Sequence, residues 1–315
     1  MADIVLVHGI AQEQRSAADI ECEWLPNLAG GLENAGHTSL ADRVRREADP
    51  RPGAITVRMA FYGNQFLTPD HQGLSPDLLR PVEKVIAEEL ALELLHNAAE
   101  SPHPKDAGEA RRAVADLTST LEDAQGQLGR TGSRAIAALD RIPWFTRAGL
   151  AGLSLANRTV AQVAIYLADT VIRAAAINQV TQHLDLNTRV IIGHSLGSVV
   201  AYEALRAQPP ATPIPLLVTL GSPLGLSAIN RRLQQPPSYP AGLRRWINLA
   251  APDDVVAARS DLLPVFDHDR PNGARFDRTW KVDNGSEPHR AGFYLTKHSC
   301  GQAVGDALGR PAPAL

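Results

Sequence analysis

Six short apolar runs along the chain have the length and composition of buried β-strands. The longer segments between them carry apolar residues at helical spacing. Buried parallel strands are covered by crossover helices, so this alternation predicts an α/β fold with a mostly parallel central sheet flanked by helices. The predicted strands are residues 4–7, 55–61, 189–193, 216–220, 245–249 and 279–282.

The interval between the second and third predicted strands is much longer than one crossover helix requires. Extra structure must therefore be inserted there. The predicted organisation is an α/β core made of residues 1–65 and 158–315. Residues 66–157 form a predicted helical insertion, which would act as a lid or cap.

Apolar spacing within and after this insertion predicts three helices. One starts at Pro81, a second covers residues 114–128, and a third covers residues 158–184 and returns to the core. Small residues predict a loosened segment inside the insertion, because glycine and serine favour turns. These residues are Gly126, Gly129, Gly132 and Ser133.

The end of the insertion is apolar and rich in small residues, over residues 142–145 and 148–156. One hypothesis is that this stretch forms an acyl pocket or makes a peripheral contact with a lipid interface. The other is that it only buries the joint between the insertion and the core. Both hypotheses stay open at the level of sequence.

Composition narrows the range of functions. The 31 Lys and Arg residues nearly balance the 34 Asp and Glu residues, and no long run of like charge occurs, so no nucleic-acid partner is expected. The two cysteines and the histidines lack the spacing of a metal site, so neither a metal nor a cofactor is expected. No signal peptide or membrane span is predicted, and the cysteine usage suits a cytoplasmic protein.

Residues 189–202 combine a buried strand, the pentapeptide G-H-S-L-G and an amphipathic helix. The pentapeptide alone is a weak signal, since short motifs arise by chance. A strand before it and a helix after it are what a sharp turn exposing a serine hydroxyl requires. Ser195 would then lie at the positive end of a helix, which favours a developing oxyanion.

With these flanks, the chain resembles serine hydrolases of the α/β-hydrolase fold, among them bacterial lipases and esterases that carry G-H-S-L-G. The resemblance covers residues 1–65 and 158–308. The segment Val7-His8-Gly9-Ile10 follows the first strand, where the family has His-Gly before an oxyanion-hole residue. The resemblance therefore implies that the backbone N–H groups of Ile10 and Leu196 form the oxyanion hole.

A nucleophilic serine requires a histidine base and a carboxylate that orients this histidine. In the family the chain order is serine, acid, histidine. Asp253 and Asp254 both follow the predicted strand at 245–249, and spacing alone permits either. The family's tendency to follow the acid with x-Val-Ala favours Asp254.

Chain order leaves three histidines as candidate bases. His268 precedes the last predicted strand, whereas the family's base follows it, so His268 is interpreted as a surface residue. His289 lies in the breaker-rich loop after that strand and is the favoured base. His298 falls in the first turn of the terminal helix and is the alternative. His194 is expected to point away from Ser195 and to serve in packing.

These residues predict a serine esterase or lipase that hydrolyses a carboxylic ester through an acyl-enzyme on Ser195. The partner would be a small-molecule or lipid ester, and no oligomeric state is predicted. An acyltransferase or a thioesterase would use the same triad. A protein that has the fold but acts only in non-catalytic interactions is the alternative from a different class.

Overall fold

A parallel β-sheet forms the centre of the computed structural model, which describes residues 2–45, 54–67, 79–123, 128–147, 155–209 and 213–309. Within these ranges the sheet has seven strands in the order β2-β1-β3-β4-β5-β6, and β7 also pairs with β5. All pairs are parallel, which confirms the predicted α/β architecture. The strands are β1 Ile4–Val7, β2 Val57–Ala60, β3 Val190–His194, β4 Leu216–Leu220, β5 Arg245–Ala250, β6 Arg275–Phe276 and β7 Trp280–Lys281.

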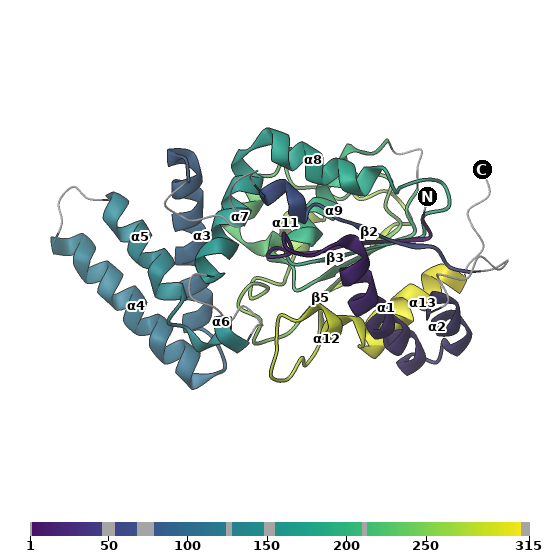
Figure 1. Cartoon of the computed structure of the whole chain (residues 1–315), viewed down its shortest axis with the longest axis horizontal. Helices are drawn as coiled ribbons and strands as arrows, with labels where there is room; N and C mark the ends of the chain where they lie inside the picture. Colours follow the sequence, from purple (N-terminus) through teal and green to yellow (C-terminus); the bar gives the residue numbers. More distant parts are fainter. Residues whose placement is uncertain are drawn as a thin grey trace.

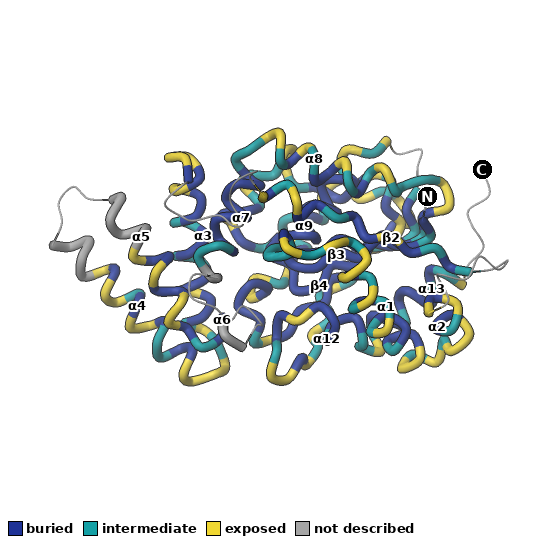
Figure 2. Tube along the Cα trace, viewed as in Figure 1, coloured by how far each residue is buried: buried dark blue, intermediate teal, exposed yellow. Residues whose placement is uncertain are grey.

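The sheet separates two buried clusters, because successive side chains of a strand point to opposite faces. In β1, Ile4 and Leu6 join one cluster, and Val5 and Val7 join the other. Figure 2 shows the central strands β3 and β4 as buried and the outer turns of the helices as exposed. The first cluster includes α1 (Ala17–Asn34), α2 (Thr38–Arg45), α12 (Ala291–Leu295) and α13 (His298–Gly309). The second includes α7 (Leu155–Ala168), α8 (Thr170–Thr181) and α9 (Leu196–Ala207).

The strand β6 is absent from the six predicted strands because a two-residue pair leaves no readable alternation. Short helical turns complete the described core. They are η1 (Gly63–Phe66), η3 (Pro223–Gly225), α10 (Ser227–Asn230) and α11 (Leu263–Phe266).

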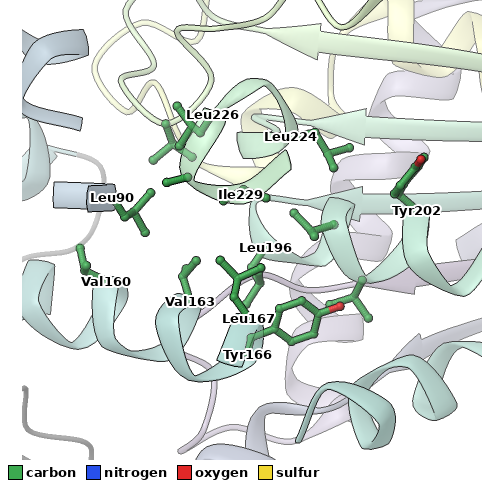
Figure 3. Packing of buried hydrophobic residues seen from close by; sticks show 14 of the residues in the cluster. Leu90, Val160, Val163, Tyr166, Leu167, Leu196, Tyr202, Leu224, Leu226 and Ile229 are labelled. Carbon is green, nitrogen blue, oxygen red and sulfur yellow. The ribbon is translucent and has the colours of Figure 1, made fainter. Parts of the chain in front are cut away.

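Within the described residues, the segment predicted as an insertion forms helices that extend to one side of the sheet (Figure 1). They are α3 (Pro81–Ala99), α4 (Pro104–Asp123), α5 (Leu128–Leu139) and α6 (Pro143–Arg147). The helix predicted from Pro81 is confirmed. The helix predicted over residues 114–128 ends at Asp123, and residue 128 begins α5. Figure 3 shows Leu90 of α3 beside Val160 and Val163 of α7, where these helices meet the core.

The predicted loosened segment is wrong for Gly129, Gly132 and Ser133, which lie inside α5; Gly126 is outside the described residues. Glycine in a helix costs about 1 kcal/mol relative to alanine. Buried side chains of α5, such as Ile136 and Leu139, join the same apolar cluster as α3. Tertiary packing therefore offsets the poor local helix propensity.

The single helix predicted over residues 158–184 is also wrong, because it breaks at Asp169 into α7 and α8. The Asp169 carboxylate accepts hydrogen bonds from Val171 N and Ile172 N and so caps α8. The two helices meet at 92°. No single helix of the described chain has the length and apolar character needed to cross a membrane; α7 and α8 meet that criterion only as this bent pair.

A buried ion pair joins the three helices around this bend. Arg173 of α8 donates from Nε to Glu203 Oε2 of α9 at 2.9 Å, and Tyr166 Oη of α7 donates to the same oxygen at 2.6 Å. Both charged side chains are less than one-tenth exposed. Such a pair is stable only when its remaining polar atoms are also bonded. The Gln234 N–H meets part of this need by donating to Glu203 Oε1.

Candidate active site

Ser195 lies in a tight connection between β3 and α9. Its backbone has φ 52° and ψ −130°, a conformation that is strained for a residue with a side chain. A Cβ at Gly197 would lie 2.3 Å from the carbonyl oxygens of Val7 and His8. Only glycine allows α9 to approach β1 this closely, and the approach places Ser195 at the carboxyl edge of the sheet.

The structure brings Ser195, His289 and Asp254 into one hydrogen-bonded chain. His289 Nε2 lies 2.9 Å from Ser195 Oγ, and His289 Nδ1 lies 2.8 Å from Asp254 Oδ2. All three residues are buried, Asp254 completely. An ionised carboxylate only accepts hydrogen bonds, so the His289 proton lies on Nδ1 and Nε2 is free to accept the serine proton.

The two carboxylates at the end of β5 have different environments. Asp254 Oδ1 accepts from the N–H groups of Val256 and Ala257 at 3.1 and 3.3 Å, so its orientation is fixed by its own loop. Asp253 Oδ2 instead lies 3.0 Å from Nε2 of His103, in the loop between α3 and α4. Geometry therefore selects Asp254, of the two, as the carboxylate that contacts His289.

The other two candidate histidines lie away from this chain. His298 begins α13 and its side chain is exposed, as is that of His268. The His268 carbonyl accepts from Tyr239 N at 2.9 Å, which gives this residue a structural role. Of the three histidines that chain order permits, only His289 reaches Ser195.

Two further side chains contact this hydrogen-bonded chain and were not assigned this role from the sequence. Tyr294 Oη donates to Asp254 Oδ2 at 2.7 Å and accepts from Ala251 N at 2.9 Å. His194 Nε2–H donates to the His289 carbonyl at 2.7 Å. Burial lowers the pKa of His194 well below its ordinary value, so this imidazole is neutral. His194 packs against the rings of Trp24 and His289, as expected, and its hydrogen bond to the His289 carbonyl is a further contact that the sequence did not predict.

The loop after β1 packs directly on Ser195. A Cβ at Gly9 would lie 2.9 Å from Ser195 Cβ, so glycine is required there. His8 Nδ1–H donates to the Gly9 carbonyl at 2.6 Å, and His8 Nε2 accepts from Tyr62 N at 3.1 Å. Burial lowers the pKa of His8 to about 4, so the ring stays neutral and keeps both bonds near pH 7.

Ile10 and Leu196 line the same cavity as Ser195. Within the described part of the chain, neither of their backbone N–H groups has a hydrogen-bond acceptor. Two such donors beside a serine hydroxyl have the composition of an oxyanion hole.

The cavity has a volume of about 470 Å³ and contains Ser195 and His289 in its wall. One side of it is apolar, with Leu90 and Leu94 from α3, Val163 from α7, and Leu226 and Ile229 from the η3–α10 segment. Figure 3 shows several of these side chains facing one another. Charged residues also line the cavity: Glu13, Arg15, Glu23, Arg158, Glu287 and Arg290.

The hypothesis that the apolar stretch at the end of the insertion lines a pocket can be compared with the structure only over residues 142–145. Among the described residues, the cavity wall contains none of residues 142–145. Trp144 is fully buried, and its Nε1–H donates to the Asp253 carbonyl at 2.8 Å. The hypothesised continuation over residues 148–154 lies outside the described residues. Trp144 therefore supports the loop that carries Asp254 and does not line the cavity.

Among the residues that the structure describes, no three His, Cys, Asp or Glu side chains lie close enough together to bind a metal ion. Comparisons of the chain with known protein families, curated proteins and solved structures found no match. Any assignment of function therefore depends on the geometry and chemistry of the Ser195 site.

Proposed function

We propose that the protein is a serine hydrolase of the α/β-hydrolase fold, which cleaves carboxylic esters through an acyl-enzyme on Ser195. The observation that carries this proposal is the buried Ser195–His289–Asp254 chain, with 2.9 and 2.8 Å between successive partners. It supplies a nucleophile, a general base and an orienting carboxylate at the wall of a cavity.

In the first half of the reaction, Ser195 Oγ attacks the ester carbonyl carbon as His289 Nε2 takes the serine proton. The carbonyl oxygen gains negative charge and is bound by the N–H groups of Ile10 and Leu196. His289 then protonates the alcohol oxygen as the bond from carbon to that oxygen breaks. The alcohol leaves, and the acyl group remains on Ser195.

In the second half, His289 takes a proton from water, which attacks the acyl carbon. The collapsing intermediate releases the carboxylic acid, and the proton returns from His289 to Ser195 Oγ. Asp254 stays ionised throughout and stabilises the imidazolium form of His289. Its two bonds from Val256 and Ala257 hold it in the orientation that this role requires.

The cavity supports an ester with an apolar acyl group. The wall formed by α3, α7 and α10 is apolar and continuous with Ser195, so an acyl chain there would be removed from water. The charged residues that also line the cavity suit the polar alcohol part of the ester. No membrane-bound or nucleic-acid substrate is required by this arrangement.

The test is hydrolysis of p-nitrophenyl esters from acetate to palmitate by the purified protein. Adjacent or same-type residues provide matched controls: Asp254→Asn against Asp253→Asn, and His289→Ala against His298→Ala. Ser195→Ala, Asp254→Asn and His289→Ala should each lower kcat by at least a thousandfold, and the two controls by less than threefold. Full activity of folded Ser195→Ala would refute the proposal.

The apolar wall offers a second test. Leu94 and Leu95 are adjacent on α3 and both buried, but only Leu94 lines the cavity. Each substitution by alanine should destabilise the protein by about 2–5 kcal/mol. Only Leu94→Ala should move the optimum acyl length, towards longer esters. An unchanged profile in Leu94→Ala would exclude this wall as the acyl site.

A further inference from the structure

The loop that carries Ile10 contains a residue in an unfavourable backbone conformation. Ala11 has φ 58°, in the left-handed region, which costs an alanine about 1–2 kcal/mol. A conformation of this kind persists only where surrounding contacts impose it. The Ala11 N–H donates to Oε1 of Gln162 at 2.8 Å, and Gln162 belongs to α7, 151 positions away in the sequence.

The Gln162 amide can adopt only one orientation at this position. Gln162 is 1% exposed, and its Nε2 donates to Glu13 Oε2 at 2.9 Å. Because a carboxylate cannot donate, the NH₂ group of Gln162 must face Glu13, which leaves Oε1 facing Ala11. Glu13 is itself held by an ion pair with Arg158, one turn before Gln162 on α7.

We propose that Gln162 is a positioning residue that holds the Ile10 N–H in place to bind the substrate carbonyl oxygen. The Ala11 N–H belongs to the peptide unit that follows Ile10, so fixing this unit fixes the residue that supplies the N–H. Glu13 and Arg158 act one step further away by orienting the Gln162 amide. The inference rests on the proposed function, in which Ile10 stabilises the developing oxyanion.

A donor that acts on the oxyanion contributes to the transition state and not to the bound ester. Loss of its positioning should therefore lower kcat and leave KM unchanged. The test variant is Gln162→Met, which keeps the length of the side chain and removes both polar atoms. We expect kcat for a p-nitrophenyl ester to fall about 10- to 100-fold, with KM within twofold.

An aliphatic trifluoromethyl ketone provides a second readout. Its carbonyl adds to a catalytic serine and forms a tetrahedral oxyanion, so it reports on the oxyanion hole directly. Its inhibition constant should rise in Gln162→Met by the same factor as kcat/KM falls. If Gln162 only stabilised the fold, the inhibition constant and kcat/KM would not change by the same factor.

Two further variants complete the experiment. Tyr166→Phe removes another buried hydrogen bond of α7, the one to Glu203, which does not contact Ala11, and should lower the melting temperature without changing kcat. Gln162→Glu combined with Glu13→Gln exchanges the two partners, keeps an acceptor for Ala11 N, and should restore kcat to within about fivefold of wild type. If Gln162→Met does not fold, the comparison of this double variant with Glu13→Gln alone still tests the proposal.

Wild-type kcat in folded Gln162→Met, or an equal loss of kcat in Tyr166→Phe, would overturn the positioning role and leave the proposed hydrolase intact. A double variant no better than Glu13→Gln alone would also overturn it. If the wild type neither hydrolyses esters nor binds the ketone, the proposed function itself fails, and the role of Gln162 fails with it.

Discussion

Replacement of Tyr294 by Phe tests what the buried hydroxyl beside Asp254 contributes. Tyr294 Oη donates to Asp254 Oδ2 at 2.7 Å and accepts from Ala251 N at 2.9 Å. A hydrogen bond to a charged group contributes about 1.5–3 kcal/mol, and a buried N–H left unpaired costs about 1–3 kcal/mol. The ring keeps its apolar contacts. We therefore expect the free energy of unfolding to fall by about 3 kcal/mol.

Tyr202→Phe is the matched control, because the buried Tyr202 hydroxyl likewise makes two hydrogen bonds: it donates to the Ser238 carbonyl and accepts from Ser238 N. Tyr202 does not line the Ser195 cavity. Urea unfolding followed by circular dichroism should show a loss of stability in both variants at unchanged m.

Of the two variants, only Tyr294→Phe should lower kcat for ester hydrolysis, by about tenfold, because the Tyr294 hydroxyl bonds the carboxylate that holds His289 and the Tyr202 hydroxyl does not. The reasoning is refuted if Tyr294→Phe unfolds within about 0.5 kcal/mol of wild type. It is equally refuted if Tyr202→Phe lowers kcat to the same extent.

Three other predictions follow from buried groups and close contacts. Burial lowers the pKa of His8 from 6.5 to about 4. As the pH falls between these values, the His8 ring takes up a proton in the unfolded chain but not in the folded protein, so the free energy of unfolding decreases. His8→Asn should reduce this decrease by about 3 kcal/mol, measured by urea unfolding at pH 7 and pH 4. Glu203→Gln leaves Arg173 buried without its counter-charge and should cost about 3–5 kcal/mol, against less than about 1 kcal/mol for Glu109→Gln in an exposed pair, compared by thermal unfolding. Gly197→Ala should prevent stable folding because of the contacts of its Cβ with β1, whereas Gly108→Ala on α4, where a Cβ meets nothing within 4 Å, should raise the melting temperature.

The pattern of apolar and polar residues along the chain was sufficient to predict most of the strands of the central sheet. Strands such as β3 and β4 are continuous apolar runs because they are covered on both faces, and this signal depends on neighbouring residues alone. The break at Asp169 was missed because a helix-capping side chain is also an ordinary polar position in an amphipathic helix. The helix α5 was missed because its glycines indicate a loop, and only packing of Ile136 and Leu139 opposes them.

Residue order along the chain shows which residue types are available to the site: a serine after a buried strand, two aspartates after another, and histidines beyond them. Spacing alone left both Asp253 and Asp254 open, because adjacent positions differ only in where their side chains point, and only the resemblance to the hydrolase family favoured Asp254. Spacing also gives no information on distant partners. It could not reveal Tyr294 or Gln162, whose partners lie 40 and 151 positions away. A hydrogen bond requires a donor–acceptor distance of about 3 Å, with a tolerance of a few tenths of an ångström. Only the tertiary structure brings groups so far apart in the sequence within that distance.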